Sequence, residues 1–199
     1  VKSMAAAKAI IVDSDQMKDA IQRFSQSRIN VHVIRNGIDL DAIGEATQRI
    51  WTASGGRSAV LSMRGLTPLY RIEEIVRKRN ESAKYRGTPL TFIYPFYEEK
   101  YRTVLLPLLA RTDAEHGSLN KARMYDLMAR TRLAISIPSS DSSPRSVYEA
   151  IFCGGAGAIT HHAYYDVLPN CAQQRIVLVD LADTAWFHRA MDAAARSAA

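Results

Sequence analysis

The sequence predicts an α/β domain of the Rossmann-like type, with a parallel sheet and helices on both of its faces. Short apolar runs alternate with amphipathic segments along almost the whole chain, and this alternation is typical of strand–helix–strand units. Hydrophobic residues make up 47% of the 199 positions, which is enough to bury a sizeable core. Turn signals such as Asn36-Gly37, where both residues tolerate a positive φ, separate the segments.

Hydrophobic periodicity and helix-capping signals give the expected elements in chain order. The expected strands are Ala9–Val12, Val31–Ile34, Ser58–Met63, Leu90–Tyr94, Ala134–Ile137, Gly157–Ile159 and Arg175–Val179. The expected helices are Gln16–Phe24, the first part of Asp39–Gly56, Tyr70–Asn80, Glu99–Ala110, Lys121–Arg130, Pro144–Cys153 and Asp183–Arg196. Pro107 must kink or end its helix, and His161–Gln174 is expected to be a loop. Because such sheets bind ligands at the carboxyl ends of their strands, the turns after the strands are the candidate sites: Asn36-Gly37, Arg64-Gly65, Pro95-Phe96 and Ser139–Ser143.

The net charge and the two cysteines limit the kinds of ligand and site that the chain is expected to have. The formal net charge is +6, which suits nucleic acid, anionic lipid or a phosphorylated small ligand. The basic residues are dispersed, however, and aromatic residues are not interleaved with them as a single-strand-binding surface requires. Cys153 and Cys171 form no metal-binding spacing and indicate free thiols in a reducing compartment. No apolar run approaches the roughly 18 residues of a membrane-spanning helix.

The stretch Ile135–Ile159 contains the richest set of candidate site residues. Ser143 is a good N-cap, and Pro144 is a good first residue for the helix that follows. The exposed amides of that helix, near Ser146, form an anion site, to which Arg145 and Arg64 add positive charge. Glu149 lies one turn further on and can accept hydrogen bonds from paired hydroxyls such as those of a ribose. Amides for phosphate and an acid for ribose together describe a nucleotide.

Each of these residues also has an explanation without a ligand. A serine and a proline cap many helices, and Glu149 can simply complement the helix dipole. Arg64 can be a surface charge, and Asp141 a turn residue. The residue chemistry alone leaves these alternatives open.

Five sequence motifs follow one another with a recognisable order and spacing. They are Ile34–Asp39 (IRNGID), Leu61–Leu66 (LSMRGL), Met124–Leu127 (MYDL), Ala134–Ser139 (AISIPS), and Asp141-x7-Glu149-Ala150 followed by Gly154 and Ala158-Ile159. The set resembles the C-terminal, donor-binding domain of retaining GT-B glycosyltransferases, and is most similar to the GT4 type. The resemblance covers nearly the whole chain.

The resemblance implies a role for each matching residue. Glu149 would bind the ribose of a nucleotide-sugar, and Asp141 would lie at the second acid's position near the sugar hydroxyls. Arg64 would bind the diphosphate, helped by Arg145 and by the amides of Ser143–Ser146. The segment His116, Gly117, Ser118 and Leu119 would lie near the base. The family needs no metal and no other cofactor, since the nucleotide-sugar is itself a substrate.

The chain departs from the family pattern at three places. The first acid is Asp141 instead of the usual Glu, which shortens its reach. Tyr70-Arg71 replaces the usual Lys-Gly, so either Arg71 supplies the missing cation or the phosphate is held more weakly. Tyr94-Pro95-Phe96 replaces a glycine-rich loop, which puts base contacts at that loop in question.

The family fold has two Rossmann-like domains with the active site between them, so this chain is expected to be one half of such a protein. Residues 1–26 would be the tail of the N-terminal acceptor domain with its linker, and residues 27–199 the nucleotide-sugar-binding domain. The chain is expected to bind a nucleoside-diphosphate (NDP) sugar donor weakly and to transfer nothing without the missing acceptor domain.

The expected activity of the whole enzyme is retaining transfer of a glycosyl group to an acceptor hydroxyl in surface glycan or glycolipid synthesis. The location would be cytoplasmic, and the basic charge is compatible with peripheral association at the inner face of the membrane. An ordinary basic soluble domain accounts for the same charge, and nucleic acid is not the expected partner. Two alternatives remain: an NDP-sugar epimerase or hydrolase of related fold, and a non-catalytic basic module that binds nucleotide or nucleic acid.

Overall fold

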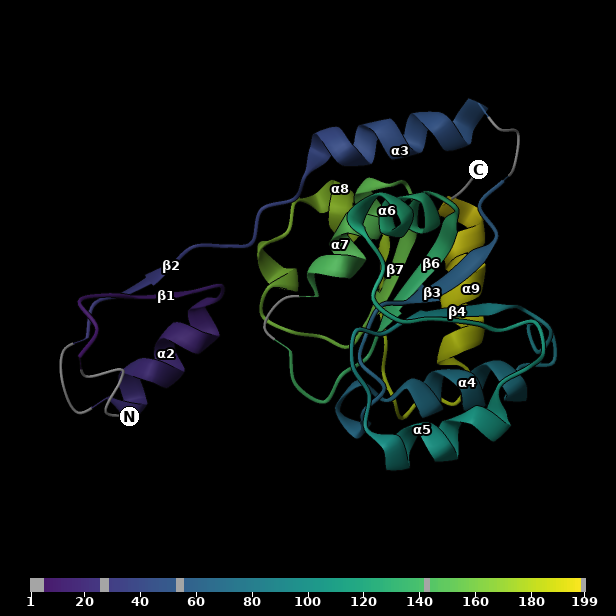
Figure 1. Ribbon diagram of the computed structural model, residues 1–199, viewed down its shortest axis with the longest axis horizontal. Helices are drawn as coiled ribbons and strands as arrows, with labels where there is room; N and C mark the ends of the chain where they lie inside the picture. The colour runs from purple at the N-terminus through teal and green to yellow at the C-terminus, as the bar shows by residue number, and fades with distance from the viewer. Residues whose placement is uncertain (1–5, 26–28, 53–55, 142–143, 198–199) are drawn as a thin grey trace.

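The computed structural model describes residues 6–25, 29–52, 56–141 and 144–197 (Figure 1). In these parts of the chain the main sheet has six strands, all parallel, in the order β5-β4-β3-β6-β7-β8. The strands are β3 (Ala59–Ser62), β4 (Leu90–Ile93), β5 (Ala114–His116), β6 (Thr131–Ser136), β7 (Ala156–Ile159) and β8 (Ile176–Leu178). Strands β3, β4 and β5 follow one another from the middle of the sheet to one edge, and β6, β7 and β8 follow one another from the middle to the other edge. The strand order therefore reverses between β3 and β6, which are neighbours in the sheet.

Helices cover both faces of this sheet, which confirms the predicted fold class. The helices of the main body are α3 (Leu40–Thr52), α4 (Ile72–Glu81), α5 (Glu99–Leu105), α6 (Lys121–Ala129), α7 (Arg145–Phe152), α8 (Asn170–Gln173) and α9 (Trp186–Ser197). Short 3₁₀ turns are η1 (Pro68–Tyr70), η2 (Leu106–Leu108) and η3 (Tyr165–Val167).

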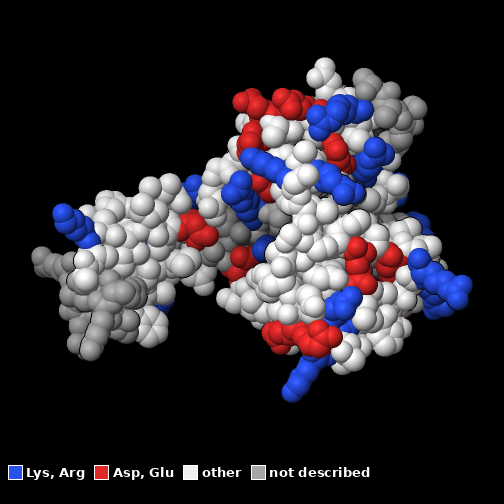
Figure 2. All heavy atoms as spheres, in the orientation of Figure 1, with Lys and Arg blue, Asp and Glu red and all other residues white. Residues whose placement is uncertain are grey.

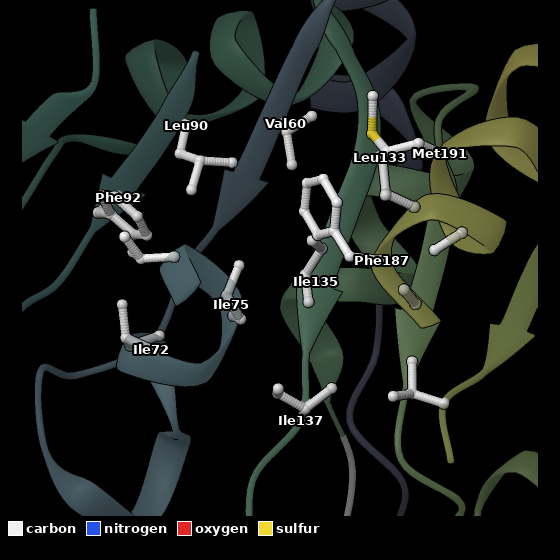
Figure 3. Close-up of a cluster of buried hydrophobic side chains, with 14 of the residues drawn as sticks. Val60, Ile72, Ile75, Leu90, Phe92, Leu133, Ile135, Ile137, Phe187 and Met191 are labelled. Carbon is white, nitrogen blue, oxygen red and sulfur yellow. The ribbon is translucent and has the colours of Figure 1, made fainter. Parts of the chain in front are cut away.

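The two hydrophobic clusters follow from the period-two alternation of strand side chains. Val60, Leu133 and Ile135 point to one face, where they pack with α4 and α9 (Figure 3). Leu61 and Ala134, one position along, point to the other face and pack with α3, α6 and α7. Both faces of the central strands are buried, as is usual for a parallel sheet between two helix layers.

Most predicted elements are confirmed, and the differences have local causes. The strand β5 was not predicted, because Ala114-Glu115-His116 lacks apolar alternation and becomes a strand by pairing with β4. The helix α4 begins at Ile72, two residues later than predicted, because Arg71 adopts a left-handed φ of 51° after the turn η1. Pro107 ends α5 as expected, and η2 follows it. The segment expected to be a loop contains η3 and α8.

A smaller unit precedes the main body and consists of β1 (Ile10–Val12), α2 (Asp15–Phe24) and β2 (Val31–Val33). The strands β1 and β2 pair only with each other among the described residues, and Figure 1 shows the unit set apart from the main sheet. Ser14 caps α2 by accepting from the amide of Met17. The unit spans the predicted boundary between residues 26 and 27, since β2 belongs to it. That it is the tail of an acceptor domain stays a prediction.

A buried ion pair ties α4 to the far edge of the main sheet. The guanidinium of Arg79 donates to both carboxylate oxygens of Asp113 at 2.9 and 2.6 Å, and also to the carbonyl of Thr88 at 2.7 Å. Asp113 further accepts from the amides of Leu90 and Ala110. Both partners are almost completely buried, so the network keeps two charges out of water only by satisfying them fully.

No helix among the described residues is long and apolar enough to cross a membrane.

We expect Asp113→Ala to lower the free energy of unfolding by about 3–5 kcal/mol, because it leaves the buried Arg79 charge without its partner. Chemical denaturation followed by circular dichroism measures this change. The exposed pair of Arg49 and Asp126 provides the control, since Asp126→Ala should cost no more than roughly 1 kcal/mol. A similar small cost for both variants would contradict the structural role of the buried pair.

Candidate functional site

The predicted phosphate-binding arginine and the first predicted acid meet where the strand order reverses. Arg64 follows β3, and Asp141 follows β6 beyond a short turn. The Nη2 of Arg64 lies 2.5 Å from the Oδ2 of Asp141, and its Nε donates to the Oγ of Ser136 at 2.9 Å. Both charged side chains are 15% exposed. The site therefore lies in the crevice where open parallel sheets bind their ligands.

The second predicted acid is buried beside this pair. Glu149 of α7 is 4% exposed and accepts from the hydroxyl of Tyr125 at 3.0 Å and from the Nε of Arg145 at 3.2 Å. Burial, together with the neighbouring Glu149, raises the pKa of Tyr125 to about 12, so the phenol stays protonated and donates. Burial likewise raises the pKa of the Cys153 thiol to about 12, which makes this cysteine a packing residue and a poor nucleophile.

A cavity of about 470 Å³ opens at this place. Its lining residues are Met63, Arg64, Lys121, Met124, Arg145, Ser146 and Glu149. Four of them, namely Arg64, Arg145, Ser146 and Glu149, are residues that the sequence nominated for a nucleotide-sugar. The cavity combines three basic side chains with one buried carboxylate, which is suitable for a ligand that carries both phosphates and hydroxyls.

Lys121 lines this cavity and was not predicted from the sequence. It begins α6, beyond the end of β5, and forms an ion pair with Asp39 that lowers the pKa of that carboxyl. Lys121 is the first residue of the helix that follows β5. Because ligands bind at the carboxyl ends of the strands, this position could have nominated it.

Other predicted residues lie elsewhere or outside the described chain. Arg71 donates to the carbonyls of Ile137 at 3.3 Å and Pro138 at 3.1 Å, and it lines a different cavity from Glu149. Its predicted phosphate contact stays a prediction. Ser143 lies outside the described residues. Pro144 stands at the N-cap of α7 instead of inside the helix, and its carbonyl accepts from the amide of Val147.

The predicted base-proximal segment lies at the same edge of the sheet, two strands away from Arg64. His116 ends β5, and its carbonyl accepts from the amide of Tyr94. Leu119 packs against the hydrophobic cluster that contains Tyr125. A side chain at Gly117 would meet no atom within 4 Å, so the segment is open on that side, and Ser118 follows it.

A tyrosine–histidine pair, also missed from the sequence, borders the site. The hydroxyl of Tyr148 lies 3.2 Å from the Nε2 of His162, which follows β7. Burial raises the pKa of Tyr148 and lowers the pKa of His162, although the nearby Asp141 acts in the opposite direction on the histidine. The phenol is therefore protonated and the imidazole neutral at pH 7, and the imidazole tautomer sets the direction of their hydrogen bond. His162 lies three residues beyond the end of β7, so the rule that nominated Arg64 could have nominated it too.

We expect His162 to make the protein less stable as the pH falls. Its folded-state pKa is below the ordinary value of 6.5, so the unfolded chain binds more protons below that pH and the free energy of unfolding decreases. The groups around it are Tyr148, Asp141, His161, Arg64 and Asp166. Denaturation curves between pH 7 and 5 should show a smaller loss of stability for His162→Gln than for the original chain. Equal losses would contradict this account of His162.

Comparison with known proteins gives a structural likeness. No family model and no curated protein match the sequence. HepE from Anabaena, in complex with UDP and glucose, matches with a TM-score of 0.76 at 13% identity, over 98% of this chain and 56% of its own. A UDP-forming trehalose-phosphate synthase from Burkholderia xenovorans matches with a TM-score of 0.68 at 17% identity, over 98% of this chain and 55% of its own. AviGT4, a glycosyltransferase involved in avilamycin A biosynthesis, matches with a TM-score of 0.63 at 14% identity, over 93% and 53%.

At these identities the likeness establishes a shared fold, in agreement with the predicted parallel α/β class. The chain spans about half the length of each of these proteins.

Proposed function

We propose that the chain is the donor-binding half of a retaining glycosyltransferase and binds a nucleoside-diphosphate sugar. The observation that carries this proposal is the cavity at the strand-order reversal, which places Arg64, Arg145 and the buried Glu149 around one space. The structural neighbours support it, since HepE is in complex with UDP-glucose and the trehalose-phosphate synthase forms UDP. UDP is therefore the first nucleotide to test.

In this proposal the diphosphate binds the basic side of the cavity. Arg64, Lys121 and Arg145 supply the positive charge, and the N-terminal turn of α7 adds the positive end of its dipole. These groups stabilise the charge that develops on the leaving diphosphate, so the proposed chemistry uses no metal ion. They play the part that a divalent cation plays in other phosphate sites.

The proposed ribose site is Glu149. Its carboxylate accepts from two groups within the protein, Tyr125 and Arg145, while a carboxylate offers about four acceptor positions. Tyr125 holds one oxygen in place from the buried side. The remaining capacity can take the two ribose hydroxyls from the side of the cavity.

Asp141 and the diphosphate compete for Arg64 in this arrangement. A contact of 2.5 Å joins Arg64 to Asp141. A diphosphate on Arg64 weakens this pairing, and Asp141 then accepts hydrogen bonds from the sugar hydroxyls. The acceptor oxygen bonds to the anomeric carbon, the bond from that carbon to the diphosphate breaks, and the hydroxyl proton passes to the released nucleotide.

The acceptor side belongs to the rest of the protein in this proposal. The chain spans about half of its structural neighbours, so we expect it to bind donor and to transfer nothing alone. Surface glycan or glycolipid synthesis, on the cytoplasmic side and at the inner membrane surface, is the proposed setting. On the face shown in Figure 2, acidic and basic side chains are interspersed over the main body, which favours a small phosphorylated ligand over nucleic acid.

Variants of the cavity test the proposal by calorimetry with UDP, after a thermal-shift screen of UDP, GDP and dTDP. Glu149→Gln keeps the size of the side chain but removes its charge, and Arg64→Met removes the guanidinium. Each should weaken binding about 10- to 100-fold, because each removes hydrogen bonds to a charged group.

Asp141→Asn is the matched control in this experiment. It should leave the affinity for UDP equal or higher, since it releases Arg64, and should weaken the binding of the complete UDP-sugar. Normal UDP affinity in both Glu149→Gln and Arg64→Met would show that the nucleotide does not bind in this cavity. Release of free or epimerised sugar by the full-length protein would instead favour a hydrolase or epimerase.

A further inference from the structure

An aromatic patch lies beside the site and takes no part in the contacts described so far. It consists of Leu69 and Tyr70, after β3, and Phe96 and Tyr97, after β4. The rings of Tyr70 and Phe96 lie 6.3 Å apart. Phe96 is 51% exposed, Tyr97 49% and Leu69 40%, so the patch presents apolar surface at the carboxyl edge of the sheet.

The patch is held rigidly. The ring of Phe96 lies directly on Gly65, where a β-carbon would come within 2.3 Å of it. The amide of Leu66 donates to the carbonyl of Phe96 at 3.1 Å, and the amide of Glu98 donates back to the carbonyl of Leu66 at 2.9 Å. The glycine and these paired hydrogen bonds fix Phe96 in place while leaving half of its surface open. A fixed aromatic surface loses little conformational entropy when it binds a ligand.

Arg64 joins the patch to the proposed nucleotide cavity. Its guanidinium carbon lies 5.6 Å from the ring centroid of Tyr70, and the same side chain lines the cavity that contains Glu149. If the nucleoside of a ligand binds at Glu149 and its phosphates bind Arg64, the group attached to the last phosphate would therefore lie beyond Arg64. The patch and Asp141 are the surfaces that this group would meet.

We propose that the aromatic patch binds the sugar ring of the nucleotide-sugar, with Phe96 stacked against a C–H face of the ring. This inference rests on the proposed function. A pyranose has apolar C–H faces and a polar edge of hydroxyls, so it fits a flat ring placed beside a carboxylate and a guanidinium. The segment Tyr94-Pro95-Phe96, which follows β4, supplies the stacking surface.

The size of the patch favours a small ligand over a protein partner. Aromatic side chains bury about 150–250 Å² each when fully covered, so the half-exposed rings of Phe96 and Tyr97 together offer on the order of 200 Å², and Leu69 adds less than either ring. A stable protein interface needs roughly 800 Å² from each partner. A single sugar ring can cover the smaller area.

The test compares the binding of UDP and UDP-glucose to the chain by calorimetry, with other NDP-sugars as substitutes if the thermal-shift screen selects another base. Phe96→Ala should leave the affinity for UDP unchanged and raise the ratio of the dissociation constants, UDP-sugar to UDP, at least fivefold. Phe96→Tyr should preserve the ratio. Gly65→Ala, which displaces the ring, should raise it as Phe96→Ala does.

Phe152→Ala is the matched control, because Phe152 on α7 is 52% exposed and lies outside the patch. It should change neither affinity. An unchanged ratio in Phe96→Ala, with UDP still bound, would overturn the proposed sugar contact and leave the proposed nucleotide site intact. Failure of the original chain to bind any nucleotide or NDP-sugar would overturn both proposals together.

Discussion

The contact between Arg64 and Asp141 depends on one topological constraint, the reversal of strand order between β3 and β6. These two residues are 77 positions apart in the sequence. Arg64 and Asp141 meet because β3 and β6 are neighbouring parallel strands, so the segments that follow them begin at the same edge of the sheet. The rest of the proposed site is arranged around this point, with Glu149 in the helix that follows β6 and the aromatic patch on the loops that follow β3 and β4.

Two buried carboxylates show how a structural acid differs from a candidate binding acid. Asp113 accepts from the guanidinium of Arg79 through both oxygens and also from two backbone amides. Its acceptor capacity is used within the protein, so it stabilises the fold. Glu149 is similarly buried but borders a cavity, and its donors Tyr125 and Arg145 use only part of its capacity. The unused capacity, and not burial as such, makes Glu149 a candidate ligand-binding residue.

The sequence predicted elements with strong apolar periodicity and the residues that follow them. Arg64 and Asp141 could be nominated because each lies just beyond an apolar strand, and Glu149 because it lies one turn inside a capped helix. The strand β5 could not be predicted, since its polar residues become a strand only through pairing with β4. The left-handed Arg71 is set by the turn before α4 and by the carbonyls it binds, which depend on the tertiary structure.

Contacts between distant segments were likewise beyond sequence reasoning. The fit of Phe96 over Gly65 joins two loops, and the pairing of His162 with Tyr148 joins a loop to a helix. Neither leaves a periodic signal. The rule that ligands bind at strand ends nominated the Pro95-Phe96 turn as a position, but the aromatic surface that it forms with Tyr70 required the folded structure.

A crystal structure of the chain with a bound UDP-sugar is the most direct test of the central claim, that a nucleotide-sugar binds where β3 and β6 meet. The account predicts diphosphate oxygens within hydrogen-bond distance of the Arg64 guanidinium, and both ribose hydroxyls within hydrogen-bond distance of the Glu149 carboxylate. Density for the nucleotide at another cavity, with Arg64 still paired only to Asp141, would contradict it.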